Sequence, residues 1–214
     1  ASLGGGERIT GRSQYLVDSL VSGLLLLGED SPWLWEKMSG VKAILAGYGH
    51  SIALFENGRM EAWGNNRNGQ TNSPKGLEQV ISVSAGGWHS LALKVNGEAV
   101  AWGDNSLGQA AVPHGLTNVT MIAAGGYHSL ALKSDGAVVG WGNNHFDQTS
   151  VPSCLGKVKA IAAGSYHSLA LTEDGSVHGW GWNGKGQTGV PLGLGKVKAI
   201  SAEGHFSVAL KEDG

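Results

Sequence analysis

Hydrophobic residues come in short runs along this chain, and the same order of runs returns every 39 residues. The clearest copy, residues 158–191, reads VKAIAAGSYHSLALTEDGSVHGWGWNGKGQTGVP. Earlier copies begin at Val41, Val80 and Val119, and a further one begins at Val197. Periods of about 20–50 residues are typical of arrays whose units bury their apolar faces against their neighbours. The chain is therefore predicted to be a repeat protein.

Each unit is predicted to be all-β, because runs such as VKAIAA, SLALT and SVHGW are too short for helices and are separated by turn residues. An Asn-Gly or Asp-Gly pair between the second and third runs predicts a tight hairpin. These pairs are Asn57-Gly58, Asn96-Gly97, Asp135-Gly136 and Asp174-Gly175. A fourth short strand is expected to end at Pro74, Pro113, Pro152 and Pro191. Four antiparallel strands per unit make one blade of a β-propeller.

The consensus of the repeat, AGxxHSLAL…DG…WGxNxxGQ…VP, resembles the repeat sequence of the regulator of chromosome condensation (RCC1) superfamily. The blades lack insertions, and this short form is similar to the propeller-type β-lactamase inhibitor proteins of soil bacteria. The resemblance covers residues 41–214 and implies a propeller, for which seven blades are the family norm. The likeness is much less specific for function, because one fold hosts many activities.

The repeats divide the chain into an N-terminal arm, residues 1–22, and a propeller, residues 23–214. Whole units occupy residues 41–79, 80–118, 119–157 and 158–196, and a partial unit occupies 197–214. Residues 23–40 resemble the second half of a blade and are expected to complete the partial unit, which gives about five blades. A fragment of a longer propeller and an open arc closed by a partner are the alternatives.

Composition narrows the classes of function. The net charge is −2 and no basic run occurs, so nucleic-acid binding is disfavoured. The single cysteine, Cys154, excludes an intrachain disulfide and a cysteine-based metal cluster. No apolar stretch is long enough to span a membrane, and the most apolar segment, residues 15–27, contains Asp18 and lacks a cleavage site. We expect a soluble protein without a signal peptide, and its compartment stays open.

Function is expected on the face where the turns between first and second strands meet the loops after the third strands. The turns supply aromatic residues, and the loops vary where the rest of the repeat is constant. The turn residues are Tyr48, Trp88, Tyr127, Tyr166 and Phe206, and the loop residues are Arg67, Leu107, His145, Phe146 and Trp182. Aromatic and arginine side chains are common anchors of protein interfaces. The recurring turn aromatics can equally pack between blades, whereas Phe146 and Trp182 depart from the pattern of their own loops.

The His-Ser pair that opens each second strand, at His50, His89, His128 and His167, is interpreted as structural. Equivalent residues of a propeller lie far apart around the axis, so these imidazoles are not expected to share a metal ion. Adjacent residues of one strand point to opposite sides, so His and Ser are not expected to meet as base and nucleophile. No catalytic residue, metal or cofactor is predicted, and hydrogen bonds between blades are the expected role of the histidines.

The leading hypothesis is a non-enzymatic module that binds a protein partner through this loop face. Inhibition of a secreted enzyme such as a β-lactamase is a narrower form, which only the resemblance suggests. Guanine-nucleotide exchange would need an inserted wedge, and links such as residues 75–79 are short. A structural subunit of a larger assembly, attached by residues 8–27, is the remaining alternative.

Overall fold

The computed structural model describes residues 40–214, which form five antiparallel β-sheets in chain order. Four sheets have three strands in the order of the sequence, and the fifth has two. The strands are β1 (Val41–Ala46), β2 (His50–Phe55), β3 (Met60–Gly64), β4 (Val80–Ala85), β5 (His89–Lys94), β6 (Ala99–Gly103), β7 (Val119–Ala124), β8 (His128–Lys133), β9 (Val138–Gly142), β10 (Val158–Ala163), β11 (His167–Thr172), β12 (Val177–Gly181), β13 (Val197–Glu203) and β14 (Phe206–Lys211). The repeat thus sets the sheets, as predicted.

The Asn-Gly and Asp-Gly pairs form the hairpins between second and third strands. In the third sheet the backbone N–H of Lys133 donates to the carbonyl of Ala137, and the Asp135 carboxylate accepts from the N–H of Ala137. Gly136 follows with a φ of 85°, a left-handed conformation that glycine adopts without steric cost. The hairpins therefore form where the sequence predicts them.

The expected fourth strand is absent from the four complete units. Residues after β3, β6, β9 and β12 form turns and irregular backbone as far as the next unit. In the first of these segments Asn66 uses its side chain to accept from the N–H of Thr71 and to donate to Asn72. Such side-chain bonds offer the backbone an alternative to a sheet ladder, and proline donates no ladder bond. Each unit is therefore a three-stranded sheet followed by a structured loop, so the four-stranded blade was wrong.

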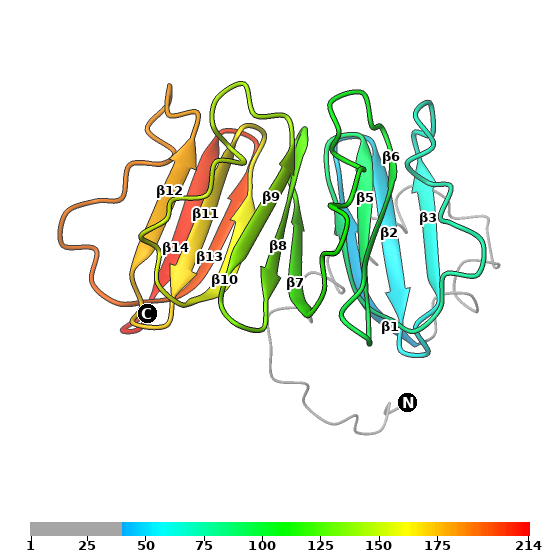
Figure 1. Cartoon of the computed structure of the whole chain (residues 1–214), viewed down its shortest axis with the longest axis horizontal. Coiled ribbons are helices and arrows are strands. Elements are labelled where there is room, and N and C mark those ends of the chain that lie inside the picture. Colours follow the sequence, from blue (N-terminus) through cyan, green and yellow to red (C-terminus); the bar gives the residue numbers. More distant parts are fainter. Residues whose placement is uncertain (1–39) are drawn as a thin grey trace, which may run out of the picture.

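Successive sheets pack on each other through their first strands, with β1 beside β4, β4 beside β7, β7 beside β10 and β10 beside β13. In Figure 1 they follow one another across the molecule, and the loops after β3, β6, β9 and β12 emerge along one edge. The core lies between sheets: Leu91 and Leu93 of β5, for example, pack with Ile122, Ala131 and Trp141 of the next unit. Each unit thus buries its apolar face on its neighbour.

A chain of hydrogen bonds joins each unit to the next. At the junction of the second and third units, His89 Nε2 lies 2.9 Å from Ser129 Oγ, and Ser129 Oγ donates to the Gln109 carbonyl at 2.8 Å. Trp141 Nε1 donates to that same carbonyl at 3.0 Å. The equivalent bonds recur on either side, and the last junction, without a tryptophan, keeps His167, Ser207 and the Gln187 carbonyl. The histidines therefore have the inter-unit role that we predicted.

The glycine at the end of each first strand makes room for this network. A Cβ on Gly125 would lie 2.4 Å from Cε1 of His128 in its own unit and 2.5 Å from the Gly164 carbonyl of the next. The fifth unit has Glu203 where the others have this glycine and Phe206 where they have the histidine. Both residues change together, so the steric demand that fixes the glycine disappears in that unit.

The fifth sheet has two strands in the described part of the chain, and Phe206 and Val208 of β14 are well exposed. Between residues 40 and 214, no comparable contact joins β1 to β13 or β14. The predicted arm, residues 1–22, and most of the segment expected to complete the fifth blade, residues 23–40, lie outside the described residues. Residues 40–214 contain no helix that is both long and apolar enough to cross a membrane.

Candidate functional site: an aromatic patch on the loop face

The loops after β3, β6 and β9 share one construction, which fixes their shape. An Asn or Asp directly after the strand accepts from the N–H two residues later and from the side-chain amide of a buried Gln five residues later. In the third unit, Asn143 accepts from the N–H of His145 at 2.8 Å and from Gln148 Nε2 at 3.1 Å. Gln148 in turn accepts from the N–H of Phe146 at 2.9 Å. Phe146 is thus presented by a rigid loop.

The loop after β12 departs from this construction at its first residue, where Trp182 replaces the Asn or Asp. Gln187, at the end of that loop, keeps its bond from the N–H of Lys185. Its buried Nε2 has no hydrogen-bond partner among the described residues. A Cβ on Gly184 would lie 2.6 Å from the Trp182 ring, so the absence of a side chain there makes room for the indole. The tryptophan replaces a structural cap with a large aromatic side chain.

Trp182 belongs to a cluster of rings that we call the aromatic patch. Its five members come from the third, fourth and fifth units: Tyr127, Phe146, Tyr166, Trp182 and His205. Tyr127 stacks on Tyr166 with ring centroids 5.2 Å apart, and His205 lies nearly parallel to Tyr166 at 6.2 Å. Phe146 meets Tyr166 edge to face at 5.5 Å, and Trp182 meets His205 in the same way at 4.8 Å. The loops of the third and fourth units thus pack against the turns of the fourth and fifth.

Exposure and electrostatics show how much of the patch a partner can reach. Phe146 is 38% exposed, His205 is exposed, and the other three residues are half-buried. Burial, with the adjacent Tyr127 hydroxyl, raises the pKa of Tyr166 above its ordinary value, so this hydroxyl stays neutral and can donate a hydrogen bond. The patch therefore offers apolar ring surface together with a polar hydroxyl donor.

Of the predicted site residues, five lie together and two do not. Tyr127, Tyr166, Phe146 and Trp182 are in the patch, and His145 contacts Phe146 at its edge with ring centroids 4.9 Å apart. Trp88 instead meets Tyr48 edge to face at 6.2 Å. Arg67 is exposed in the loop of the first unit and makes no side-chain contact with the patch that the structure records. Trp88 therefore packs on Tyr48 rather than on a ring of the patch, while the Tyr48 hydroxyl reaches Ser165, next to Tyr166.

The expectation for Phe206 was wrong by one position. A step of 39 residues from Tyr166 leads to His205, and Phe206 falls at the position of the structural histidines. His205 is therefore the patch residue that sequence reasoning missed. Applying the 39-residue period to the divergent segment AEGHFS, residues 202–207, would have identified it.

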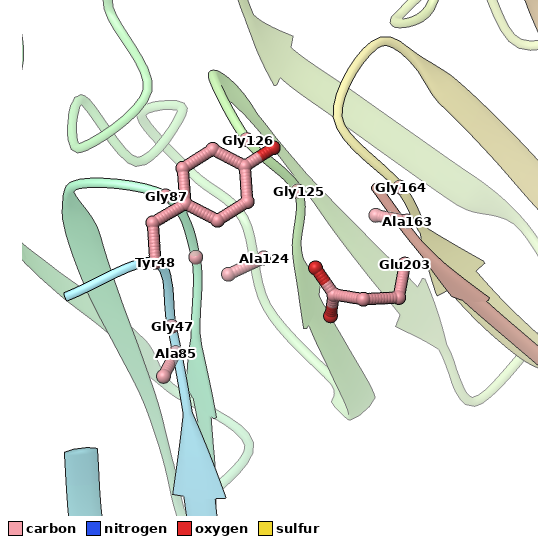
Figure 2. A pocket seen from close by; sticks show the side chains of 11 residues that line it. Gly47, Tyr48, Ala85, Gly87, Ala124, Gly125, Gly126, Ala163, Gly164 and Glu203 are labelled. Carbon is pink, nitrogen blue, oxygen red and sulfur yellow. The ribbon is translucent and has the colours of Figure 1, made fainter. Parts of the chain in front are cut away.

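Tyr48 lies in a different position from the other turn aromatics, because it stands one residue earlier in its repeat. Its equivalents are Gly87, Gly126 and Ser165, and its ring passes over both glycines to reach the Ser165 hydroxyl. Figure 2 shows the tyrosine on one side of a hollow and the Glu203 carboxylate on the other. This hollow lies among the ends of the first strands and encloses about 10 Å³. That is room for about one water molecule, far below the roughly 300 Å³ of the smallest typical small-molecule sites.

The buried histidines do contact serines, but not the serine that follows each of them in its own strand. Each contacts a serine of the next unit, and that serine already donates its hydrogen to a carbonyl. The histidine must then donate from Nε2, which leaves Nδ1 unprotonated. Burial lowers the pKa of His89 and His167 to about 4 and that of His128 to about 3. A neutral imidazole that donates to the serine cannot take its proton, so these pairs hold the frame.

Metal binding has little support from the geometry. Among residues 40–214, no three His, Cys, Asp or Glu side chains are grouped so that they could hold a metal ion. The imidazoles of the structural histidines lie in successive units, each engaged with its own serine.

Comparison with known proteins places the repeat in a family. The model of the regulator of chromosome condensation (RCC1) repeat matches residues 41–70, 80–109, 119–148 and 158–187, which is more than half of the chain. A search of curated protein sequences gave no significant match.

Several solved structures resemble the fold. Prp20p from Saccharomyces cerevisiae, studied for its binding to Gsp1p and histones, is 22% identical with a TM-score of 0.70, over 80% of this chain and 56% of that one. Yeast RCC1 (Prp20) bound to Kap60 is 25% identical with a TM-score of 0.69, over 87% and 57%. Human WBSCR16 is 23% identical with a TM-score of 0.65, over 81% and 60%. The chain thus spans less than two thirds of the length of these structures. At these identities the likeness establishes the propeller fold and leaves function open.

Proposed function

Because this chain belongs to the RCC1 repeat family, we propose that it is a non-enzymatic interaction module that binds a partner protein through its aromatic patch. The observation that carries the proposal is the convergence of five rings from three units on one exposed face. Tryptophan and tyrosine dominate the binding energy of protein interfaces, with roughly 2 kcal/mol or more for a central anchor. The patch supplies such anchors already ordered.

The surroundings of the patch support the same class of function. Its loops contain Asn, Ser and Gly beside the aromatic residues, as in Asn143-Asn144 and Asn183-Gly184. Antibody paratopes combine the same residue types, because rigid aromatic rings give contact area and small polar residues give adaptable hydrogen bonds. The loops rest on a repeated frame of buried hydrogen bonds, and a rigid scaffold with variable loops is a common arrangement for recognition.

The related structures agree with a protein partner. Prp20p is described with Gsp1p and histones, and yeast RCC1 in complex with Kap60. We carry over only the class of partner. An inhibitor of a secreted enzyme would be one form of such a module, and a subunit of a larger assembly would be another. Nucleotide exchange has less support, because the segment between units that would hold a wedge, residues 75–79, is a short turn.

Affinity capture from an extract of the source organism tests the proposal. The full chain is compared with a Phe146→Ala, Trp182→Ala variant and with a Val95→Ala control, since Val95 is exposed at the hairpin between β5 and β6, away from the patch. We expect the first variant to lose a specific protein that the wild type and the control retain, while all three give the same circular dichroism. Equal recovery by all three would overturn the assignment of the patch.

Deletion of residues 8–27 tests the alternative of an attachment arm formed by those residues. If the patch is the contact, the shortened chain retains the partner. Loss of the partner from a shortened chain that keeps its circular dichroism would favour attachment through the arm.

A further inference from the structure

Four of the patch rings form a closed circuit, and this geometry indicates what the partner inserts. Phe146 lies 5.5 Å from Tyr166, Tyr166 lies 6.2 Å from His205, His205 lies 4.8 Å from Trp182, and Trp182 lies 6.3 Å from Phe146. The planes differ by 75° between Phe146 and Tyr166 and by 68° between Trp182 and His205. Phe146 and Trp182 are therefore steeply inclined to their neighbours Tyr166 and His205, whose planes are nearly parallel at 13°.

A cation suits such an arrangement. Neighbouring centroids are 4.8–6.3 Å apart, so one positive charge resting on this group can lie within about 6 Å of more than one centroid, the distance over which ring faces attract cations. The negative faces of several rings then act on one charge. An aliphatic side chain would gain only the contact area of the same rings, so the circuit favours a charged guest.

The chain leaves these rings without a cation of its own. Within residues 40–214 the one cationic side chain placed over a ring is Arg59, whose guanidinium lies 3.9 Å from the Phe55 centroid at a hairpin outside the patch. Two carboxylates adjoin the circuit in sequence, since Asp147 follows Phe146 and Glu203 lies two residues before His205. Lys185, in the Trp182 loop, is the nearest basic residue in sequence. The balance of charge favours a positive guest.

We propose that the partner protein places an arginine or lysine side chain on the circuit formed by Phe146, Tyr166, His205 and Trp182. This inference rests on the proposed function, because the partner supplies the cation. Arginine is the better candidate, since its planar guanidinium stacks on aromatic faces and is more weakly hydrated than an ammonium group.

Fluorine NMR offers a direct test, because the chain contains only three phenylalanines: Phe55, Phe146 and Phe206. The full chain, labelled with fluorophenylalanine, is titrated at pH 8 with acetyl-Gly-Arg-Gly-amide. The same peptide with citrulline, which has the shape of arginine without its charge, is the neutral probe. We expect the arginine peptide to shift the Phe146 signal in a saturable way and the citrulline peptide to leave it nearly unchanged. The Phe55 signal, from the first unit, serves as the internal reference.

Two variants sharpen the test. Trp182→Leu keeps an apolar side chain but removes one ring face from the circuit, and we expect the peptide to bind about five-fold more weakly. Trp88→Leu removes an aromatic residue of the same face that contacts Tyr48 instead, and we expect it to leave the affinity unchanged. Equal shifts with arginine and citrulline, no shift at tens of millimolar peptide, or an equal effect of both variants would each overturn the inference.

The failure of this inference is distinguishable from the failure of the proposed function. If the patch variant loses the captured protein while the arginine peptide does not bind, the patch is an interface that takes another group. If the arginine peptide binds while capture is unaffected by the patch variant, the native interface lies elsewhere.

Discussion

The hydroxyl groups of Tyr48 and Ser165 are hydrogen-bonded across three unit junctions, from the first sheet to the fourth. The two residues are 117 positions apart in the sequence. The bonds within one junction join residues that are only 20, 32 or 40 positions apart. Gly87 and Gly126 lie under the tyrosine ring, where a Cβ would come within about 3 Å of it. Only small residues at those positions allow the tyrosine to span the junctions.

This bond can be measured with a double-mutant cycle. Tyr48→Phe and Ser165→Ala each remove one hydroxyl, and each should lower the free energy of unfolding by about 0.5–1.5 kcal/mol, the net contribution of a typical hydrogen bond. The double variant should lose less than the sum of the two, because both single variants remove the same bond. Urea unfolding gives the coupling energy. Strict additivity would show that the hydroxyls do not interact in solution.

The buried histidines predict a loss of stability in acid. Their pKa values in the folded chain, about 4 for His89 and about 3 for His128, lie below the ordinary value near 6.5 of the unfolded chain. Between these values the unfolded state binds more protons, so stability is full above pH 6.5 and falls as the pH drops towards 4. At pH 5 each of these histidines should lower the free energy of unfolding by about 2 kcal/mol relative to its value at neutral pH.

Urea unfolding at pH 7.5 and pH 5 checks this dependence with two variants. His128→Gln should show a shallower fall of stability with pH, because one titrating group is gone. His114→Gln, at an exposed position, should follow the wild type. A wild-type stability that stays constant down to pH 4.5 would contradict neutral burial of these groups.

The indole N–H of Trp141 should contribute to the junction separately from its bulk. Trp141→Phe removes the donor to the Gln109 carbonyl and leaves most of the ring packing, so we expect a loss of about 1–2 kcal/mol. Trp102, at the equivalent position of the second unit, donates to the Gln70 carbonyl at 2.9 Å, and Trp102→Phe should cost a similar amount. Thermal and urea unfolding compare both variants with the wild type. No loss with either variant would mean that ring volume, rather than the hydrogen bond, accounts for the stabilisation.

Gly184→Ala should displace the Trp182 ring while the tryptophan itself stays in the sequence. The other units have Arg67, Ser106 and His145 at this position, so the backbone accepts a side chain there. In this loop the new methyl group would collide with the indole ring, which must turn away. We expect unfolding free energy to change by less than about 0.5 kcal/mol while partner capture and arginine-peptide affinity both fall. Lys185→Ala, next to it, should leave capture intact. Unchanged binding by Gly184→Ala would show that the orientation of Trp182 is irrelevant.

Much of the fold could be predicted from the repeat, because each strand is set by a local pattern. The Asp135-Gly136 hairpin, for example, is closed by bonds between residues 133 and 137. The missing fourth strand was harder to foresee, because the short runs between the loop and the proline, such as residues 110–113, have the composition of a strand. Gln109 and Gln148, directly before these runs, give their carbonyls and amides to side chains of the loop and of the next unit.

The sequence predicted most residues of the candidate site, but not how they are arranged. Phe146 and Trp182 stood out because they break the pattern of their loops, and they do lie together. That Trp88 would lie apart from Tyr166 could not be read from the repeat, since both occupy the same position in their units. Their neighbours differ: the loop before Trp88 offers Asn68, whereas the loop before Tyr166 offers Phe146.

The hydrogen bonds at the junctions bear on how the chain folds. Each joins a unit only to the next, so the entropy of closing one loop of about 40 residues has to be overcome at each step. Order can then spread along the chain from whichever junction forms first, as in other arrays of near-identical units. Ser129→Ala removes two of the bonds of the middle junction and should weaken it, while the Trp141 bond, the apolar core and the Tyr48–Ser165 bond still hold the units together. The cooperativity of unfolding is therefore limited by the least stable junction.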